Sequence, residues 1–303
     1  AVPIVGTCGF VVTVTADATT SPTGVTNADA VVDTFATSSH YIESAALTFS
    51  SGYKYTISVY AKASGTDVIQ LIMNNTLFGG TGTSFCNFNI FTGTVVRVGS
   101  NIESATIVPM PNGWYRCIMT SNTKTAGCSY AIQFALTNSA DPTSPRPSYT
   151  GASSSTYFWG AQVERSDYVS SYIKTTTSQA TRPAEVAVLN SSPWFLNNVG
   201  SVYLEFIPIT AKTNAVLSLD NNTASEVVKM SLSGSDPYMT VVDGGTTQAS
   251  IDAGTVSFNS VNKVAITFDT NSFNVCINGG AVVSDYSGTL PAITQMQLGK
   301  DSQ

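Results

Sequence analysis

Apolar and polar residues alternate at every second position along most of this chain, and the spacing of an amphipathic helix is nearly absent. In residues 54–61, for example, the odd-numbered positions are apolar or aromatic, which is the pattern of a strand with one buried face. The same pattern predicts further strands at residues 68–73, 114–120, 130–136, 202–206, 215–219, 227–232, 238–242, 263–268 and 273–277.

Glycine-containing turns separate these runs. The strongest hairpin signals are Asp-Gly-Gly at 243–245 and Asn-Gly-Gly at 278–280, because Asn, Asp and Gly tolerate positive φ angles. Many short strands separated in this way favour antiparallel sheets that pack face to face. The predicted fold class is all-β, with two consecutive antiparallel β-sandwich (jelly-roll) domains.

A polar tract between the two halves predicts the domain boundary. The sequence TTTSQATRP ends in Pro183 and is typical of an extended surface linker. We therefore expect a first sandwich at residues 1–175, a linker at 176–190, and a second sandwich at 191–303 that is incomplete at its C-terminal end.

Composition excludes two classes of partner. Thirteen basic and 19 acidic residues give a net charge of −6 without a basic cluster, so we expect no nucleic-acid binding, which needs concentrated positive charge. No stretch approaches 18 apolar residues, so we expect no membrane insertion. Only 11% of residues are charged, against roughly a quarter in an average protein, so the surface must consist largely of Ser, Thr, Asn and Gly.

The five cysteines are scattered, odd in number and without a C-x-x-C pair. We expect mostly free thiols, with a Cys117–Cys128 bridge between neighbouring strands as the alternative.

Four segments of the first half resemble a carbohydrate-binding-module-like β-sandwich that recurs in bacteriophage tail and fibre proteins. They are GYKYTISVYAKA (52–63), FNIFTGTV (88–95), NGWYRCIMT (112–120) and YFWGAQVERSDYVSSYIKTTTSQATRPAE (157–185). In the last segment, alternation places Tyr157, Trp159, Ala161 and Val163 on one face of a strand. The second half resembles a concanavalin-like or laminin-G-like jelly roll, through PWFLNNVGSVYLEF (193–206) and KVAITFDTNSFNVCINGGAVV (263–283).

These resemblances imply a structural protein of a bacteriophage tail or head fibre, assembled in the host cytoplasm and located at the virion surface. The implied role is a virion appendage or decoration protein that binds host-surface glycans weakly and multivalently. The implied partners are other virion proteins and further copies of the chain, with a trimer slightly favoured. A purely structural module without ligand is the alternative, and a polysaccharide depolymerase tailspike is a less favoured one.

Candidate catalytic residues are sparse, so we expect no enzyme and no catalytic residue. His40 is the single histidine and no nucleophile motif accompanies it. Glycoside hydrolysis needs two carboxylates about 5–10 Å apart. Glu164 and Asp167 stand three residues apart at the end of a strand, and Glu205 has no second acid on its own face.

Cofactors are not expected, although calcium is possible because Asp side chains and carbonyl oxygens leave little trace in a sequence. The residues that could contribute are Asp17, Asp29 and Asp33, or Asp220 with Asn221 and Asn222. The alternative is that these residues form turns and solvated edges.

Carbohydrate binding needs aromatic faces beside amide and hydroxyl groups. Trp114 and Trp159 lie within predicted strands, so we expect both in the core. Phe78, in NNTLFGGTG, and Tyr238, in GSDPYMT, lie outside the alternation and are the candidate carbohydrate-binding residues. For each, simple loop packing is the alternative.

Overall fold

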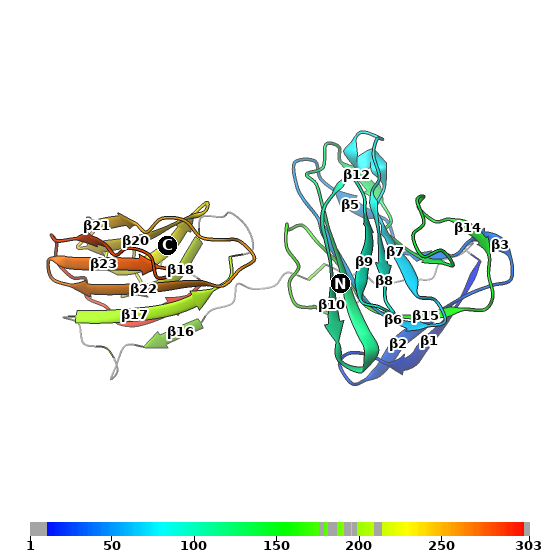
Figure 1. The fold of residues 1–303 in the computed structure, drawn as a ribbon, viewed down its shortest axis with the longest axis horizontal. Helices are drawn as coiled ribbons and strands as arrows, with labels where there is room; N and C mark the ends of the chain where they lie inside the picture. Colours follow the sequence, from blue (N-terminus) through cyan, green and yellow to red (C-terminus); the bar gives the residue numbers. More distant parts are fainter. Residues whose placement is uncertain are drawn as a thin grey trace. The chain divides into compact units, whose positions relative to one another are not determined.

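The computed structural model of the chain describes residues 11–175, 179–180, 187–190, 195, 199–208 and 214–299. The chain divides into two compact units, Ala1–Arg182 (unit 1) and Pro183–Gln303 (unit 2). The described residues form antiparallel strands and two short 3-10 turns, η1 (Asn75–Phe78) and η2 (Pro111–Gly113) (Figure 1). The predicted all-β fold class is therefore confirmed, and no described helix is long and apolar enough to cross a membrane.

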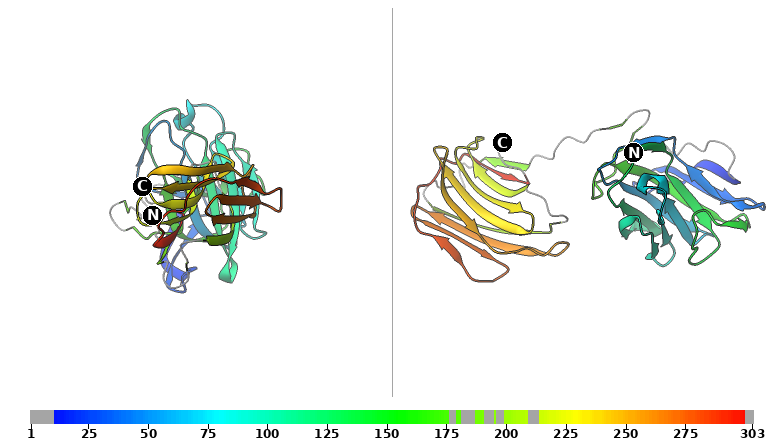
Figure 2. Two further views of the ribbon diagram at one scale, coloured as in Figure 1. Left: turned by 90° about the vertical axis from the view of Figure 1, so that its left-hand side faces the viewer. Right: turned by 90° about the horizontal axis from the view of Figure 1, so that it is seen from above.

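Unit 1 has two main sheets that pack face to face (Figure 2). The six-stranded sheet has the order β1 (Val12–Thr20), β2 (Thr26–Asp33), β15 (Ser155–Glu164), β6 (Thr56–Ser64), β11 (Trp114–Ser121), β10 (Ile102–Met110). The five-stranded sheet has the order β4 (Tyr41–Glu43), β13 (Gln133–Thr137), β7 (Val68–Ile72), β8 (Phe85–Asn89), β9 (Thr94–Val98). Two short ribbons accompany them, β12 (Cys128–Tyr130) with β5 (Leu47–Phe49), and β14 (Ser148–Thr150) with β3 (Thr37–Ser39).

The core of unit 1 lies between the two main sheets. The odd-numbered positions of β6, among them Ile57 and Val59, are fully buried there, as the alternation predicts. Thr56 and Ser58 on the other face of β6 are also buried, because the segment after β15 folds back over that face. The Thr56 hydroxyl donates to the Ser166 carbonyl at 3.0 Å.

A β-bulge in β15 corrects one predicted face. The register of β15 against β6 shifts between Trp159 and Gln162, and Gly160 takes a φ of +61°. The extra residue turns the strand over. Ala161 therefore points into the core, whereas Trp159 lies on the outer face of the sheet.

Unit 2 is a second antiparallel sandwich. Its six-stranded sheet has the order β16 (Ala187–Asn190), β25 (Gln295–Leu298), β18 (Asn214–Asp220), β19 (Val227–Ser233), β20 (Asp236–Asp243), β21 (Thr246–Asp252). Its four-stranded sheet has the order β17 (Val199–Phe206), β22 (Asn262–Asp269), β23 (Ser272–Ile277), β24 (Val283–Asp285). Met230 and Met239 of one sheet and Ile266 and Phe273 of the other are buried in one core. Both predicted Gly-rich turns have positive φ, at Gly244 (+57°) and Asn278 (+49°).

The predicted linker, residues 176–190, differs from the structure at its C-terminal end. Residues 187–190 are strand β16, which pairs with β25. A four-residue strand has too little alternation to be recognised locally, and its hydrogen-bond partner lies about a hundred residues further along the chain. Residues 176–178 and 181–186 lie outside the described part of the chain.

Candidate functional site

A pocket of about 380 Å³ opens at one end of unit 1, where several strands terminate. Its lining comes from the end of β2, the β6–β7 turn, the end of β8, the residues that follow β13, and β14 with the residues after it. Apart from short apolar groups, this lining consists of hydroxyl, amide, carboxylate and backbone groups. It is a polar pocket.

The floor of the pocket is built around the buried carboxylate of Asp33. The Tyr149 hydroxyl donates to Asp33 Oδ2 at 3.0 Å, and the amides of Ala152 and Ser154 donate to Oδ1 at 3.1 and 2.7 Å. Three donors therefore compensate this buried charge, as burial requires. Burial, together with the hydrogen bond to Asp33 and its charge, raises the pKa of Tyr149, so its hydroxyl stays protonated and keeps donating.

The rim of the pocket is chemically open. Asp67, Asn138 and Ser139 line it and are exposed, and within the described residues their side chains have no hydrogen-bond partner. The protein thus saturates the polar groups of the floor and leaves those of the rim available to a ligand.

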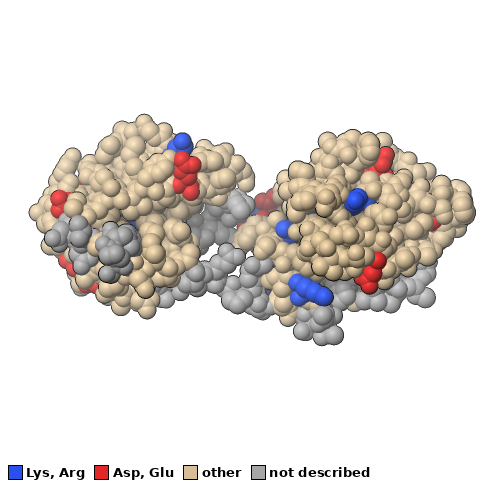
Figure 3. Space-filling view, turned by 90° about the horizontal axis from the view of Figure 1, so that it is seen from below, with Lys and Arg blue, Asp and Glu red and all other residues tan. Residues whose placement is uncertain are grey.

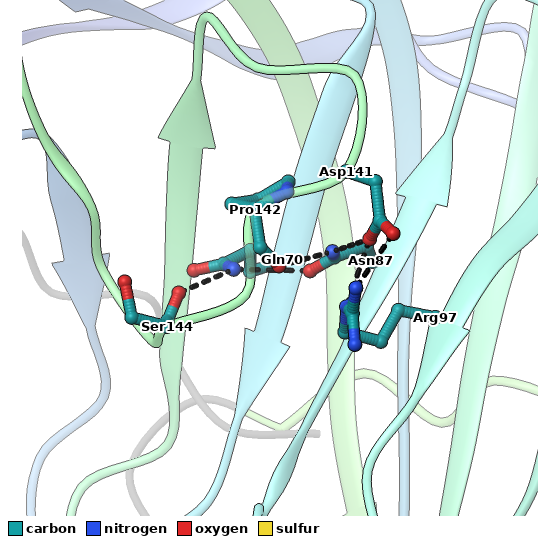
Figure 4. Close-up of polar contacts among 6 residues, drawn as sticks. All are labelled: Gln70, Asn87, Arg97, Asp141, Pro142 and Ser144. Carbon is teal, nitrogen blue, oxygen red and sulfur yellow. Dashed lines mark hydrogen bonds and ion pairs between the residues drawn. The ribbon is translucent and has the colours of Figure 1, made fainter.

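One wall of the pocket continues into a segment that crosses the outer face of the five-stranded sheet. We call residues 138–147 the strap. Asn87 and Gln70, opposite each other on β8 and β7, hold it, and both side chains are fully buried (Figure 4). Asn87 Nδ2 donates to Asp141 Oδ1 at 2.9 Å and to the Pro142 carbonyl at 2.8 Å. The two buried amides therefore replace a neighbouring strand for this irregular backbone.

Gln70 completes the attachment on both sides. Its Nε2 donates to Asn87 Oδ1 and to the Ser144 carbonyl, each at 3.0 Å (Figure 4). Its Oε1 accepts from the Arg146 amide at 2.8 Å. The strap, and with it the pocket wall, is fixed by side chains of the sheet.

An exposed ion pair closes the outer edge of this network. Arg97 donates to both oxygens of Asp141, at 2.8 and 2.6 Å (Figure 4). The hydrogen bond from Arg97 lowers the pKa of Asp141. Because the two side chains are 34% and 42% exposed, water screens the pair and its contribution is about 0–1 kcal/mol.

Charged side chains are sparse on the visible surface. On the face drawn in Figure 3, Lys, Arg, Asp and Glu occur singly or in small groups among uncharged residues. Such a surface provides no strong field for a highly charged ligand.

The structure corrects the prediction for Phe78. Its side chain is only 9% exposed and belongs to the core of unit 1. Asn74 caps η1 by accepting from the Thr76 amide at 2.7 Å, and Gly79 ends the turn in the left-handed conformation. This local geometry turns the ring inward, so Phe78 offers no face to a sugar.

Tyr238 lies in unit 2 and belongs to a regular strand, not to a loop outside the alternation. It stands on β20 opposite Asp252 and is partly exposed. The charge of Asp252 is the largest cause that raises the pKa of its hydroxyl. The two predicted carbohydrate-binding residues thus lie in different units.

The candidate catalytic residues are engaged in separate contacts. The Glu164 carboxylate accepts from the Ser170 amide at 3.2 and 3.1 Å. Glu205 accepts from the Tyr203 hydroxyl at 2.5 Å on an exposed sheet face of unit 2. His40 is fully buried, with Nδ1 2.6 Å from the Val11 carbonyl oxygen.

The candidate calcium residues also have protein partners. Asp220 is buried and accepts from Ser218, Gln295, Gln297 and the Asn222 amide. Asp29 Oδ1 accepts from the Asp17 amide at 3.0 Å. Within the described ranges, no three His, Cys, Asp or Glu residues gather so as to hold a metal ion.

The cysteines that the structure describes are free. Cys117 is fully buried and forms no bridge to Cys128, and burial raises the pKa of Cys86 to about 12. Cys8 lies outside the described residues.

The motif around residues 157–173 forms a clip on the outer face of unit 1. The centroid of the Trp159 ring lies 4.5 Å from the centroid of the Tyr172 ring and 5.2 Å from that of the Tyr60 ring. Gln162 Oε1 accepts from the Ile173 amide at 2.9 Å. Trp159 is therefore half-buried outside the main core, whereas Trp114 is buried and its indole donates to the Thr20 carbonyl at 3.1 Å.

The pocket itself was not foreseen. Its lining comes from five segments spread over more than a hundred residues, and Asp67 and Asn138 are ordinary turn residues. Only the packing of strand ends brings them together, so no local signal marks them.

Comparisons with known proteins find distant structural neighbours and no relative in sequence. No family model and no curated protein matches the chain. Among solved structures, domains LG4-5 of the mouse laminin α1 chain match with 8% identity and a TM-score of 0.32, over 84% of this chain and 78% of that chain. The LG1-3 region of the laminin α2 chain matches with 13% identity and the same TM-score, over 85% of this chain and 59% of that chain. Laminin G domains are therefore among its structural neighbours, but TM-scores below 0.5 support no argument about function.

Proposed function

We propose that this chain is a saccharide-binding protein and that the polar pocket of unit 1 receives a neutral sugar. The observation that carries the proposal is the division of the pocket into a saturated floor and an open rim. Asp33 and Tyr149 are locked by hydrogen bonds, whereas Asp67, Asn138 and Ser139 are exposed and lack partners among the described residues.

Sugar hydroxyls fit this rim because each can donate to a carboxylate or amide oxygen and accept from an amide or hydroxyl group. The volume of about 380 Å³ is at the lower end of the range for small-ligand pockets, about 300–1,000 Å³. Without a large exposed aromatic face in the lining, binding would be weak at each site.

The biological setting of the proposal rests on the sequence motifs alone. We propose a bacteriophage appendage or decoration protein at the virion surface, joined to other virion proteins and present in several copies, with a trimer favoured. Several copies would convert weak single-site binding into useful avidity on a host surface. The carboxylates at Glu164 and Glu205 lie in different units and are bound to other groups, so we propose binding without hydrolysis.

A purely structural module is the second candidate. The clip at residues 157–173 favours it, because Gln162 and Glu164 of that motif make internal hydrogen bonds. In that case the motif only fixes the segment that follows β15 to the sheet, and the pocket binds no ligand.

Titration calorimetry of the full chain against a panel of bacterial surface oligosaccharides tests the proposal. Asn138→Ala should weaken binding by about 2- to 12-fold, the effect of losing one hydrogen bond worth about 0.5–1.5 kcal/mol. Asp67→Asn should weaken it further when combined with Asn138→Ala. Thr143→Ala, which alters an exposed strap residue outside the pocket lining, is the matched control and should bind like wild type.

Asn138→Ala and Asp67→Asn should both leave the melting temperature unchanged, since neither side chain has a hydrogen-bond partner among the described residues. Binding that survives the double substitution, or no binding to any saccharide of the panel, would favour the structural module.

A further inference from the structure

The side chain of Lys124 lies in an apolar cage at one end of unit 1. It is only 1% exposed, and its Nζ lies 4.0 Å from the ring centroid of Phe78 and 5.9 and 5.8 Å from those of Phe49 and Tyr55. The hydrogen-bond partner of Nζ is the thioether sulfur of Met73, at 3.3 Å. Aromatic faces and a sulfur attract an ammonium only weakly compared with the water it has lost.

No carboxylate forms an ion pair with Lys124 in the part of the chain that the structure describes. The charged groups on the elements packed around it are engaged elsewhere. Lys54 Nζ is 2.5 Å from Glu103, and Arg165 stacks on Tyr53.

Two further elements complete the cage, and neither carries a carboxylate side chain. The η1 turn carries no acidic residue in its first turn. On β12, the charge of Cys128 raises the pKa of Lys124, but burial, the larger cause, lowers it.

The η1 turn covers this cage, and we call it the plug. Leu77 and Phe78 of the plug are buried in the core. The Leu77 carbonyl accepts from the amides of Thr125 and Ala126, at 3.1 and 3.4 Å, so the plug is attached to the residues directly after Lys124. Gly79, Gly80 and Gly82 follow with φ angles near +75°. Because glycine has no Cβ, this segment can change its backbone conformation without steric strain when the plug moves.

We propose that Lys124 makes the plug a proton-sensitive closure of unit 1. The plug is closed while the buried amine is uncharged, and it opens when the amine takes up a proton and moves into water. The hydrogen bonds from the amides of Thr125 and Ala126 to the Leu77 carbonyl break in the same step in which the amine leaves the cage.

The direction of the pH effect follows from proton linkage. Burial lowers the pKa of Lys124 from 10.5 to about 7 in the closed state, whereas the amine regains its ordinary pKa in water. Opening therefore takes up a proton between about pH 7 and 10.5, and closure is lost as the pH falls through that window. Linkage with these two values makes the opening constant about 50-fold larger at pH 7 than at pH 9, with only about a two-fold further rise at lower pH.

Hydrogen exchange by mass spectrometry on the full chain measures this opening. Peptides that cover residues 73–84 are compared at pH 7 and pH 9, with intrinsic exchange corrected, in wild type, Lys124→Met and Lys174→Met. Lys124→Met removes the charge and keeps an apolar chain of similar length. Lys174 is exposed, so Lys174→Met is the matched control.

We expect the opening constant of residues 73–84 to rise about 50-fold from pH 9 to pH 7 in wild type and in Lys174→Met, and to stay nearly constant in Lys124→Met. An equal rise in Lys124→Met, or no rise in wild type, would overturn the proposal. So would an equal rise in peptides of β15, because the proton would then be coupled to unfolding of the whole unit.

A second measurement on wild type does not depend on the variant folding. A lysine side-chain NMR resonance that titrates with a midpoint near pH 7 and disappears in Lys124→Met supports the proposal. Lysine resonances that all titrate near pH 10 would refute it.

Discussion

Replacement of Asn87 by Ala tests whether buried amides, and not the visible ion pair, hold the strap. The substitution removes the two bonds from Asn87 Nδ2 to Asp141 and to the Pro142 carbonyl, and it removes the acceptor that Gln70 uses. The Pro142 carbonyl and one N–H of Gln70 are then buried without these partners. A lost bond costs about 1 kcal/mol and an orphaned buried group about 1–3 kcal/mol, so we expect a loss of about 2–4 kcal/mol in the free energy of unfolding of unit 1.

Arg97→Ala is the internal comparison, because it deletes two charged hydrogen bonds in the same network. These bonds are exposed, so the expected loss is about 0–1 kcal/mol. Detachment of the strap also moves the pocket wall at residues 137–140, so Asn87→Ala should weaken saccharide binding while Arg97→Ala should leave it nearly unchanged.

Urea unfolding followed by tryptophan fluorescence measures both losses. A Trp194→Phe background leaves Trp114 and Trp159 as reporters, and both lie in unit 1. The reasoning is refuted if Arg97→Ala destabilises unit 1 as much as Asn87→Ala, or if Asn87→Ala stays within about 0.5 kcal/mol of wild type.

Two further predictions concern the bulge and the thiols. Gly160→Ala should destabilise unit 1 by about 1–3 kcal/mol in the same assay, because φ is +61° and the new Cβ would meet the Tyr172 ring at 3.2 Å; a neutral effect would mean that the bulge relaxes without strain. In the native chain, a thiol reagent should modify the half-buried Cys276 before Cys117, which should react only on unfolding because it is fully buried and burial raises its pKa; equal rates at these two thiols would contradict the packing described.

Alternation by itself was enough to predict several of the strands. In β6, β11, β19 and β22 the predicted runs lie within the observed strands apart from one or two end residues, and the Gly-rich turns at 243–245 and 278–280 have the positive φ angles expected of them. The prediction succeeds because side chains alternate between the two faces of any strand, so the pattern is visible within a single segment of sequence.

The identity of the buried face could not be predicted for β15. Gly160 inserts one residue and turns the strand over, so Trp159 and Ala161 point to opposite faces. A bulge is defined by the pairing with another strand, and β6 lies about a hundred residues earlier in the chain. Strand β16 could not be predicted for the same reason, because its four residues form a strand only through pairing with the distant β25.

Site residues were the least predictable part of the chain. Phe78 has the sequence context of an exposed loop aromatic, yet a capped 3-10 turn places it over Lys124 in the core. Asp67 and Asn138, which line the pocket, have the context of ordinary turns. The sequence by itself therefore determined the all-β class, the strongly alternating strands and the low surface charge, because these depend on local periodicity and composition. Only the tertiary structure decided which polar groups are saturated and which remain open, because hydrogen-bond partners and burial come from segments distant in the chain.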